Sequence, residues 1–180
     1  MSVYNPQRDP ALMPKRLRVI DALTRTLGTI SVANGYTHDI IGGVWRGVTR
    51  FGDQNEVPML SILESPNPDI GMFAGTNSTS RKDSWTLYLQ GWGADDPLHP
   101  TDPAYYLAAD VEKCLSRVMM VNSSNGRPLL PDLYMLGRTI NGLELAPPVV
   151  RPPDELSTKA YFYLPVRIDL SINLVDPYCS

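Results

Sequence analysis

Cysteine is scarce in this sequence. Cys114 lies within a helical pattern and Cys179 lies next to the C-terminus. Neither has the CxxC spacing or the neighbouring histidine that metal centres use. We therefore expect two free thiols.

Long apolar runs and an excess of basic residues are also missing. No stretch approaches the roughly 20 residues of a membrane-spanning helix, and the opening MSVYNPQRDP has no apolar signal core. The chain has 16 Lys and Arg against 19 Asp and Glu, a formal net charge of -3. Proteins that grip nucleic acid carry a clear basic excess. We expect a protein made in the cytoplasm, with no membrane contact and no sequence-specific nucleic-acid binding.

The length and the apolar content predict one domain, residues 1–180. With 180 residues and 43% hydrophobic content, the chain is long enough to form one hydrophobic core but too short to form two separate domains of ordinary size. Its 17 prolines collect in connecting segments, which indicates few regular elements and long loops.

Two segments show the three-and-four spacing of an amphipathic helix. In the first, the apolar residues are Leu17, Ile20, Leu23, Leu27 and Ile30. Asn34 and Gly35 follow it and favour an end before Tyr36. In the second, Asp102 is predicted to cap a helix whose first residue is Pro103. Its apolar face consists of Ala104, Leu107, Ala108, Val111, Cys114, Leu115 and Val118.

Several shorter segments have strand character. Residues 36–51 are rich in β-branched and aromatic residues but are split by Gly42 and Gly43, with 44–51 the stronger half. Residues 58–64 are predicted to form a second strand that pairs with the first as a hairpin. Residues 85–92 form a strand with Trp85, Leu87 and Leu89 facing the core, and 137–145 form a further candidate strand.

The last strand has the most regular pattern in the chain. Every even position from Phe162 to Leu174 is apolar, and most of the positions between them are polar or amphipathic. Such alternation predicts one buried face and one face that meets water or a partner in an antiparallel sheet. A strand of this length would be about 50 Å long, so it is expected to bend or to project from its domain.

Three segments lack periodicity. Residues 1–14 are predicted to be an N-terminal arm, 65–84 a mobile loop and 146–158 a stiff proline-rich linker. The loop contains Met72 and Phe73 as two apolar anchors. Together the elements predict an α+β fold, with a mainly antiparallel sheet of four to five strands and two amphipathic helices packed on one face.

The sequence gives little support to catalysis or metal binding. Metal-type ligands crowd together only at His38 and Asp39 and in the group Asp95, Asp96, His99 and Asp102. The second group lies among prolines, where aspartates act as turn formers and helix caps. The sequence contains no GxSxG elbow, HExxH pair or phosphate-binding loop. We expect no catalytic residue, no cofactor and no metal, although a small hydrolase with an unfamiliar motif is an alternative.

Arg46, Arg50, Arg81 and Lys82 are candidates for a basic patch. Acidic residues lie among them, so a solvated surface or ion pairs between subunits are favoured over recognition of DNA.

Several segments, in this order, resemble phage tail terminator (tail completion) proteins. They are residues 18–23 (RVIDAL), 29–30 (TI), 34–36 (NGY), 44–47 (VWRG), 57–58 (VP), 62–64 (ILE), 89–92 (LQGW) and 100–105 (PTDPAY). The resemblance covers roughly residues 17 to 119. The last third of the chain has less recognisable sequence.

This resemblance implies a structural virion protein that forms a hexameric ring. Such a ring caps the finished tail tube, ends its polymerisation and presents a joining surface to the DNA-filled head. The implied partners are further copies of the chain, the tail tube protein and a head-completion or neck protein, with DNA passing through the lumen. A neighbouring neck, head-closure or tail tube protein of the same particle is the alternative within this class.

A subunit of this kind needs contacts with its neighbours. We expect them on the outer face of the sheet, in the loop 65–84 and at the projecting end of the last strand, with Met72, Phe73, Tyr161 and Tyr163 as interface residues. The alternative for the two tyrosines is a half-buried position beneath the linker of residues 147–153.

Overall fold

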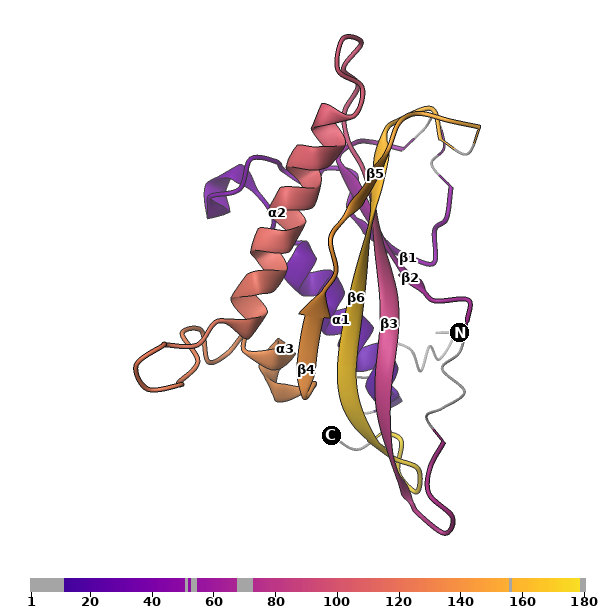
Figure 1. The fold of residues 1–180 in the computed structure, drawn as a ribbon, viewed down its shortest axis with the longest axis vertical. Coiled ribbons are helices and arrows are strands. Elements are labelled where there is room, and N and C mark those ends of the chain that lie inside the picture. Colours follow the sequence, from indigo (N-terminus) through magenta and orange to yellow (C-terminus); the bar gives the residue numbers. More distant parts are fainter. Residues whose placement is uncertain (1–11, 51, 53–54, 68–72, 156, 179–180) are drawn as a thin grey trace, which may run out of the picture.

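The computed structural model describes residues 12–50, 52, 55–67, 73–155 and 157–178. In these ranges the chain forms one six-stranded sheet with its helices on one side (Figure 1). In chain order the elements are α1 (Lys15–Leu27), the 3-10 turn η3 (Val32–Asn34), β1 (Val44–Arg46), β2 (Met59–Glu64), β3 (Ser80–Trp92), α2 (Asp102–Met119), α3 (Met135–Arg138), β4 (Gly142–Leu145), β5 (Val149–Arg151) and β6 (Tyr161–Asn173). The expected α+β class is confirmed.

The sheet is mostly antiparallel, with the strand order β1-β2-β3-β6-β4. β4 and β5 pair with different stretches of the same edge of β6. The prediction that the first two strands form a hairpin is wrong, because β1 runs parallel to β2, with Val44 opposite Leu60. Parallel neighbours cannot be joined by a tight turn.

α1 is shorter than the periodicity indicated and is rotated from the expected face. It ends at Leu27, and the amide of Gly28 donates to the carbonyl of Thr24 at 2.9 Å. Its buried residues are Val19, Leu23, Thr26 and Leu27. Leu17 and Ile20, which the spacing placed in the core, are only half-buried.

α2 matches its predicted apolar face, since all seven expected residues are buried. The predicted cap is off by one residue. Thr101 holds the N-cap position without a side-chain cap bond, and Asp102 lies in the first turn beside Pro103. A carboxylate there is still favourable, because the N-terminal end of a helix carries partial positive charge.

β3 and β6 form a long ribbon in which each of the 13 residues from Ser80 to Trp92 is paired. The ribbon bends, and its end near Ser80 extends past the helices (Figure 1). The even positions of β6 from Phe162 to Ile172 are buried, as predicted. Leu174 is the exception. It follows the last residue of the strand and is 43% exposed.

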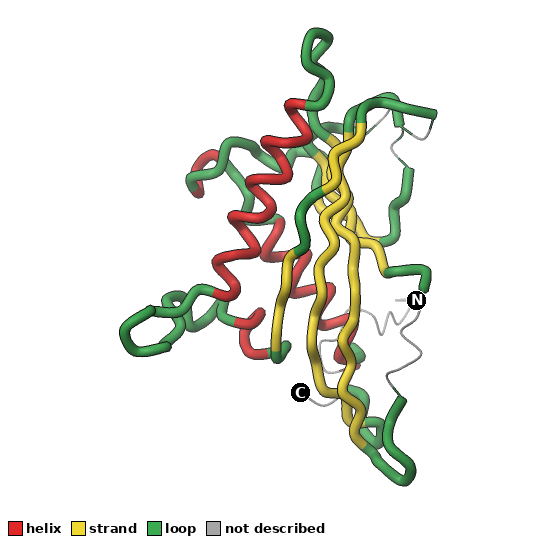
Figure 2. The backbone as a smooth tube through the Cα atoms, in the orientation of Figure 1, coloured by secondary structure: helices red, strands yellow, loops and turns green. Residues whose placement is uncertain are grey.

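Two predicted loops contain regular structure (Figure 2). Residues 80–84, assigned to the loop 65–84, belong to β3 because they pair with residues 169–173 of β6. β5 lies within the predicted linker 146–158 and pairs with the start of β6. The candidate strand 137–145 is reduced to β4, since residues 135–138 all have positive φ angles and form the short left-handed turn labelled α3.

The main core lies between the helices and the sheet. Its fully buried members include Leu23, Leu27, Leu107, Leu115 and Phe162. Cys114 is buried with a free thiol, as expected, whereas Cys179 and most of the predicted arm lie outside the described residues. In the part of the chain that the structure describes, no helix is both long and apolar enough to cross a membrane.

Candidate functional site: the uncovered face of the sheet

α1 and α2 pack on one face of the sheet, and none of the described helices lies on the other (Figure 1). The strand register places five residues of this uncovered face in one transverse row. Trp45 of β1 lies opposite Ser61, Ser61 opposite Gln90, Gln90 opposite Tyr163, and Tyr163 opposite Val149 of β5. The row therefore crosses the sheet from β1 to β5.

The centre of the row is polar and buried. Ser61 is 0% and Gln90 is 3% exposed. The Gln90 Nε2 donates to the Tyr163 hydroxyl at 3.2 Å, but the Ser61 Oγ and the Gln90 Oε1 have no hydrogen-bond partner among the described residues. An unsatisfied buried group costs about 1–3 kcal/mol.

A groove of about 700 Å³ adjoins the row. We call it the outer groove. Its lining is mainly apolar and consists of Gly47, Thr49, Leu63, Glu64, Pro66, Asn67, Tyr88, Val149, Tyr163 and Pro165. Leu63, Tyr88 and Pro165 form the next transverse row of the sheet. Apolar surface gathered in a concave site is typical of a place where another molecule binds.

The structure separates the two tyrosines predicted for the interface. Tyr163 is half-buried and lines the outer groove. Tyr161 also points to the uncovered face but is 2% exposed, because it packs in a small second core with Met59 and Trp92. Its hydroxyl donates to the Asp154 Oδ2 at 2.6 Å. Tyr161 is thus covered by its own chain, and the alternative of a tyrosine beneath the connector describes it better.

Burial, followed by the hydrogen bond to Asp154, raises the pKa of Tyr161 to about 12. Burial also raises the pKa of Tyr163, and the negative charge of Asp154 adds to this effect. Both phenols are therefore neutral at physiological pH. The two rings meet edge to face at 5.4 Å between centroids.

The structure describes part of the loop that was predicted to bind a partner. Phe73 is 81% exposed, and Met72 lies outside the described residues. Phe73 borders a second depression of about 600 Å³, together with Arg16, Asp83 and Trp85. This depression shares Glu64, Pro66, Asn67 and Tyr88 with the outer groove, so Phe73 lies beside the groove although it does not line it together with Tyr163.

Two of the four candidate basic residues form ion pairs within the chain. Arg46 pairs with Asp21 of α1 at 2.7 Å, and Arg81 pairs with Asp83. Asp83 also receives a hydrogen bond from Arg16 at 2.8 Å. Burial opposes ionisation of Asp83, but the bonds from the two arginines outweigh it and lower its pKa. Ion pairs within the chain account for Arg46 and Arg81.

The sequence did not reveal one buried polar contact, between His38 and Asp110. The Asp110 Oδ2 lies 2.8 Å from the His38 Nδ1 and accepts hydrogen bonds from the Thr37 hydroxyl at 2.6 Å and the His38 amide at 3.0 Å. Burial opposes ionisation of Asp110, but the bonds from Thr37 and His38 outweigh it and lower its pKa. The contact anchors the loop after α1 to α2. The only sequence signal was a charged residue beside the apolar face of a helix.

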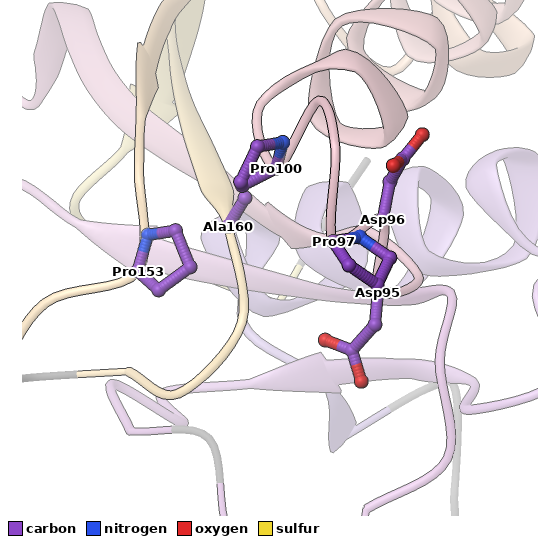
Figure 3. A pocket seen from close by; sticks show the side chains of 6 residues that line it. All are labelled: Asp95, Asp96, Pro97, Pro100, Pro153 and Ala160. Carbon is purple, nitrogen blue, oxygen red and sulfur yellow. The ribbon is translucent and has the colours of Figure 1, made fainter.

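The aspartate-rich turn before α2 serves local structure. The Asp96 Oδ1 accepts the amides of Leu98 at 2.9 Å and His99 at 3.0 Å, and Asp95 pairs with Lys159. The two carboxylates point away from each other beside a depression lined by Pro100 (Figure 3). Asp96 is confirmed as a turn former. Among the described residues no three potential ligands are placed to hold a metal ion.

Comparison with models of known protein families finds no match to this chain, and comparison with curated proteins also finds none.

Proposed function

We propose that this chain is a structural virion protein of a long-tailed bacteriophage, a tail terminator subunit. Six copies form a closed ring that caps the tail tube, ends tail polymerisation and joins the tail to the DNA-filled head. The observation that carries the proposal is the uncovered sheet face, where an apolar groove adjoins the buried, unsatisfied oxygens of Ser61 and Gln90. A surface of this kind is expected in a subunit that is completed by a neighbour.

The shape of the chain supports assembly. The β3–β6 ribbon extends past the helices at one end, so it can reach beyond its own domain (Figure 1). The outer groove lies on the face opposite the helices. Contacts that join two different surfaces lead to a ring or a filament, and a protein that stops tube growth must close.

Several carboxylates that a hydrolase could use are engaged in structure instead. Asp110 holds a loop, Asp83 joins two arginines, and Asp96 fixes a turn. This supports a protein that is not an enzyme. The formal net charge of -3 supports a ring whose lumen lets DNA pass without binding it tightly, because tight binding of phosphates requires an excess of basic residues. The partners are the tail tube protein and a head-completion or neck protein, and the subunit passes from the host cytoplasm into the virion.

The test is to purify the chain and to determine its mass by light scattering and its shape by negative-stain electron microscopy, alone and mixed with tail tubes of the same particle. We expect closed rings of one size, in solution or at one end of each tube. Tubes or stacks of many rings would indicate a tail tube protein instead. A monomer that binds no tube and hydrolyses a substrate would indicate the hydrolase.

A further inference from the structure

Asparagine is followed by glycine three times in the chain, at Asn34, Asn125 and Asn141. Asparagine is a chemically labile residue, and a glycine after it adds to the lability, because glycine has no Cβ atom to keep its backbone nitrogen away from the asparagine side chain. All three asparagines are exposed. Sequence and exposure therefore do not distinguish them, but the orientation of their side chains does.

Asn125 lies at the tip of a hairpin that follows α2. Residues 120–129 form this hairpin, which projects past the end of the helix (Figure 1). The amide of Leu129 donates to the carbonyl of Met120 at 3.0 Å and closes its base. Residues 123–127 at the tip are exposed. Opening of such a tip breaks few contacts, so it costs less free energy than opening of the core.

The side chain of Asn125 folds back over the peptide bond that follows it. Its Oδ1 accepts a hydrogen bond from the amide of Arg127 at 2.9 Å, so the side chain spans the intervening Gly126. This brings the side-chain carbonyl carbon toward the backbone nitrogen of Gly126, which favours ring closure between the two atoms. The Arg127 amide also points at the oxygen on which negative charge develops during the attack, as the donors of an oxyanion hole do.

The other two side chains are held away from the glycine that follows them. The Asn34 Nδ2 donates to the carbonyl of Thr29 at 2.7 Å, which draws that side chain back toward the end of α1. The Asn141 Nδ2 donates to the Ser171 Oγ of β6 at 3.0 Å, and Gly142 is the first residue of β4. Ring closure at either position requires that these bonds and the structure around them break.

We propose that Asn125 is a site of spontaneous deamidation and that it reacts in the folded chain ahead of Asn34 and Asn141. The backbone nitrogen of Gly126 loses its proton to water and attacks the Asn125 Cγ, which forms a cyclic imide. The bond between Cγ and Nδ2 breaks, and the nitrogen leaves as ammonia with a proton returned by water. A water molecule then adds to one of the two imide carbonyls and opens the ring to aspartate or isoaspartate.

One hydrogen bond of the hairpin opposes this reaction. The amide of Gly126 donates to the carbonyl of Asn122 at 2.8 Å and has to leave it before the nitrogen can attack. Gly126 is exposed, so water can replace the carbonyl when the tip opens. A Cβ atom at Gly126 would meet no atom within 4 Å, so this residue has space to turn. Opening of the tip, and not of the core, therefore sets the rate.

The reaction changes the surface of the hairpin and leaves the rest of the fold in place. The product carries one negative charge more than the original chain, whose formal net charge is -3. Isoaspartate also lengthens the backbone at the tip by one carbon atom. This inference does not rest on the proposed function, because it concerns the hairpin after α2 and not the uncovered face of the sheet.

The experiment follows the full chain in warm, mildly alkaline buffer, in parallel with the same chain unfolded in urea. Trypsin places the three asparagines in separate peptides, residues 26–46, 118–138 and 139–159. Mass spectrometry measures the conversion of each peptide with time, and circular dichroism verifies that the first sample stays folded. Asn125→Asp provides the aspartate product as a standard. Asn125→Gln is the control that should not react, because its side chain is one carbon too long for the same ring.

The quantity compared is the rate in the folded chain divided by the rate in urea, which removes differences that come from sequence alone. We expect this ratio to be about tenfold larger for peptide 118–138 than for the other two, which corresponds to a barrier lower by about 1.4 kcal/mol. Its product should contain both aspartate and isoaspartate at position 125.

Equal ratios for the three peptides, or a larger one for Asn34 or Asn141, would overturn the proposal. So would a folded chain in which Asn125 stays intact while the urea sample is converted. A product that contains aspartate alone would exclude the cyclic imide and would also overturn it.

Discussion

Gly91 of β3 lies directly opposite Phe162 of β6, and the phenyl ring occupies the space that a side chain at position 91 would need. A Cβ atom at Gly91 would lie 2.2 Å from the Phe162 Cε1 and 2.9 Å from the Leu60 Cδ2. Phe162 is 0% exposed. The close approach of ring and backbone explains a glycine inside a central strand.

Replacement of Gly91 by alanine is therefore expected to lower the free energy of unfolding by about 1–3 kcal/mol, because the core must shift to relieve the overlap. Urea unfolding followed by circular dichroism measures the change. Gly75→Ala is the control, since a Cβ there would lie 3.7 Å from the Ser78 Cβ in an exposed turn. A Gly91→Ala protein as stable as the wild type would show that Phe162 has room to move.

The face of β6 that packs on the helices can be tested at Ile168. This residue is 0% exposed and lies opposite Trp85 of β3 and Leu143 of β4. Ile168→Asp would bury a charge without a partner, which costs several kcal/mol against a total stability of about 5–15 kcal/mol. We expect loss of soluble folded protein on expression.

The control for Ile168→Asp is Thr86→Asp. Thr86 is half-buried on the opposite face of the sheet, directly across from Arg167. An aspartate there meets water and a guanidinium, so that variant should remain soluble and folded. Equal yields of folded protein from the two variants would contradict the assignment of faces.

The anchoring of the loop by Asp110 predicts a pH-dependent contribution to stability. The folded-state pKa of Asp110 lies below its ordinary value of 3.8. Its ionised form therefore stabilises the fold above that value, and the contribution is lost as the pH falls through the lower folded-state pKa. Asp110→Asn is expected to cost about 2 kcal/mol at neutral pH, and the difference from the wild type should narrow below pH 3.8.

Urea unfolding of both proteins at a series of pH values measures this difference. Asp132→Asn removes a carboxylate from an exposed position and serves as the control, with an expected change below about 0.5 kcal/mol. A difference for Asp110→Asn that stays constant down to the lowest pH at which the protein folds would contradict the role of the ionised carboxylate.

The hydrogen bond between Tyr161 and Asp154 ties the connector before β6 to the sheet. Tyr161→Phe removes the donor and is expected to cost about 1 kcal/mol. The folded-state pKa of about 12 lies above the ordinary value of 10.0, so the stability that Tyr161 contributes is complete below pH 10 and is lost as the pH rises toward 12.

Absorbance titration of the folded protein checks this contact. The phenol that ionises near pH 12 in the wild type should be missing in Tyr161→Phe. Tyr105→Phe, at an exposed tyrosine, should leave that step in place. If the step remains in Tyr161→Phe, another tyrosine is the one with the raised pKa.

Local periodicity in the sequence was sufficient for the parts of the fold that one element determines by itself. The apolar face of α2 and the buried positions of β6 follow from spacings of three to four and of two residues. The turn at Asp96 could also be predicted, because an aspartate beside proline accepts the amides just after it. These features depend on neighbours in the chain, so the local sequence carries the information.

Only the tertiary structure decided the pairings between distant segments. The polar residues from Ser80 to Ser84 have no strand pattern of their own and become strand because β6 pairs with them. Val44 pairs in parallel with Leu60 although a hairpin was simpler. Hydrogen bonds in a sheet join backbone groups, whose chemistry is the same at every position. The sequence of one strand therefore does not determine which other strand it pairs with.

Part of the candidate site could likewise be predicted from the sequence, and part of it depended on the tertiary structure. The alternation in β6 was enough to place Tyr161 and Tyr163 on one face of the sheet, away from the helices. It could not show that Met59, Trp92 and Asp154 bury Tyr161 while Tyr163 borders a groove. Nor could it reveal that His38 meets Asp110 across 72 residues of sequence. The burial of a side chain depends on which residues, distant in sequence, pack against it. Those contacts are determined only by the tertiary structure of the whole chain.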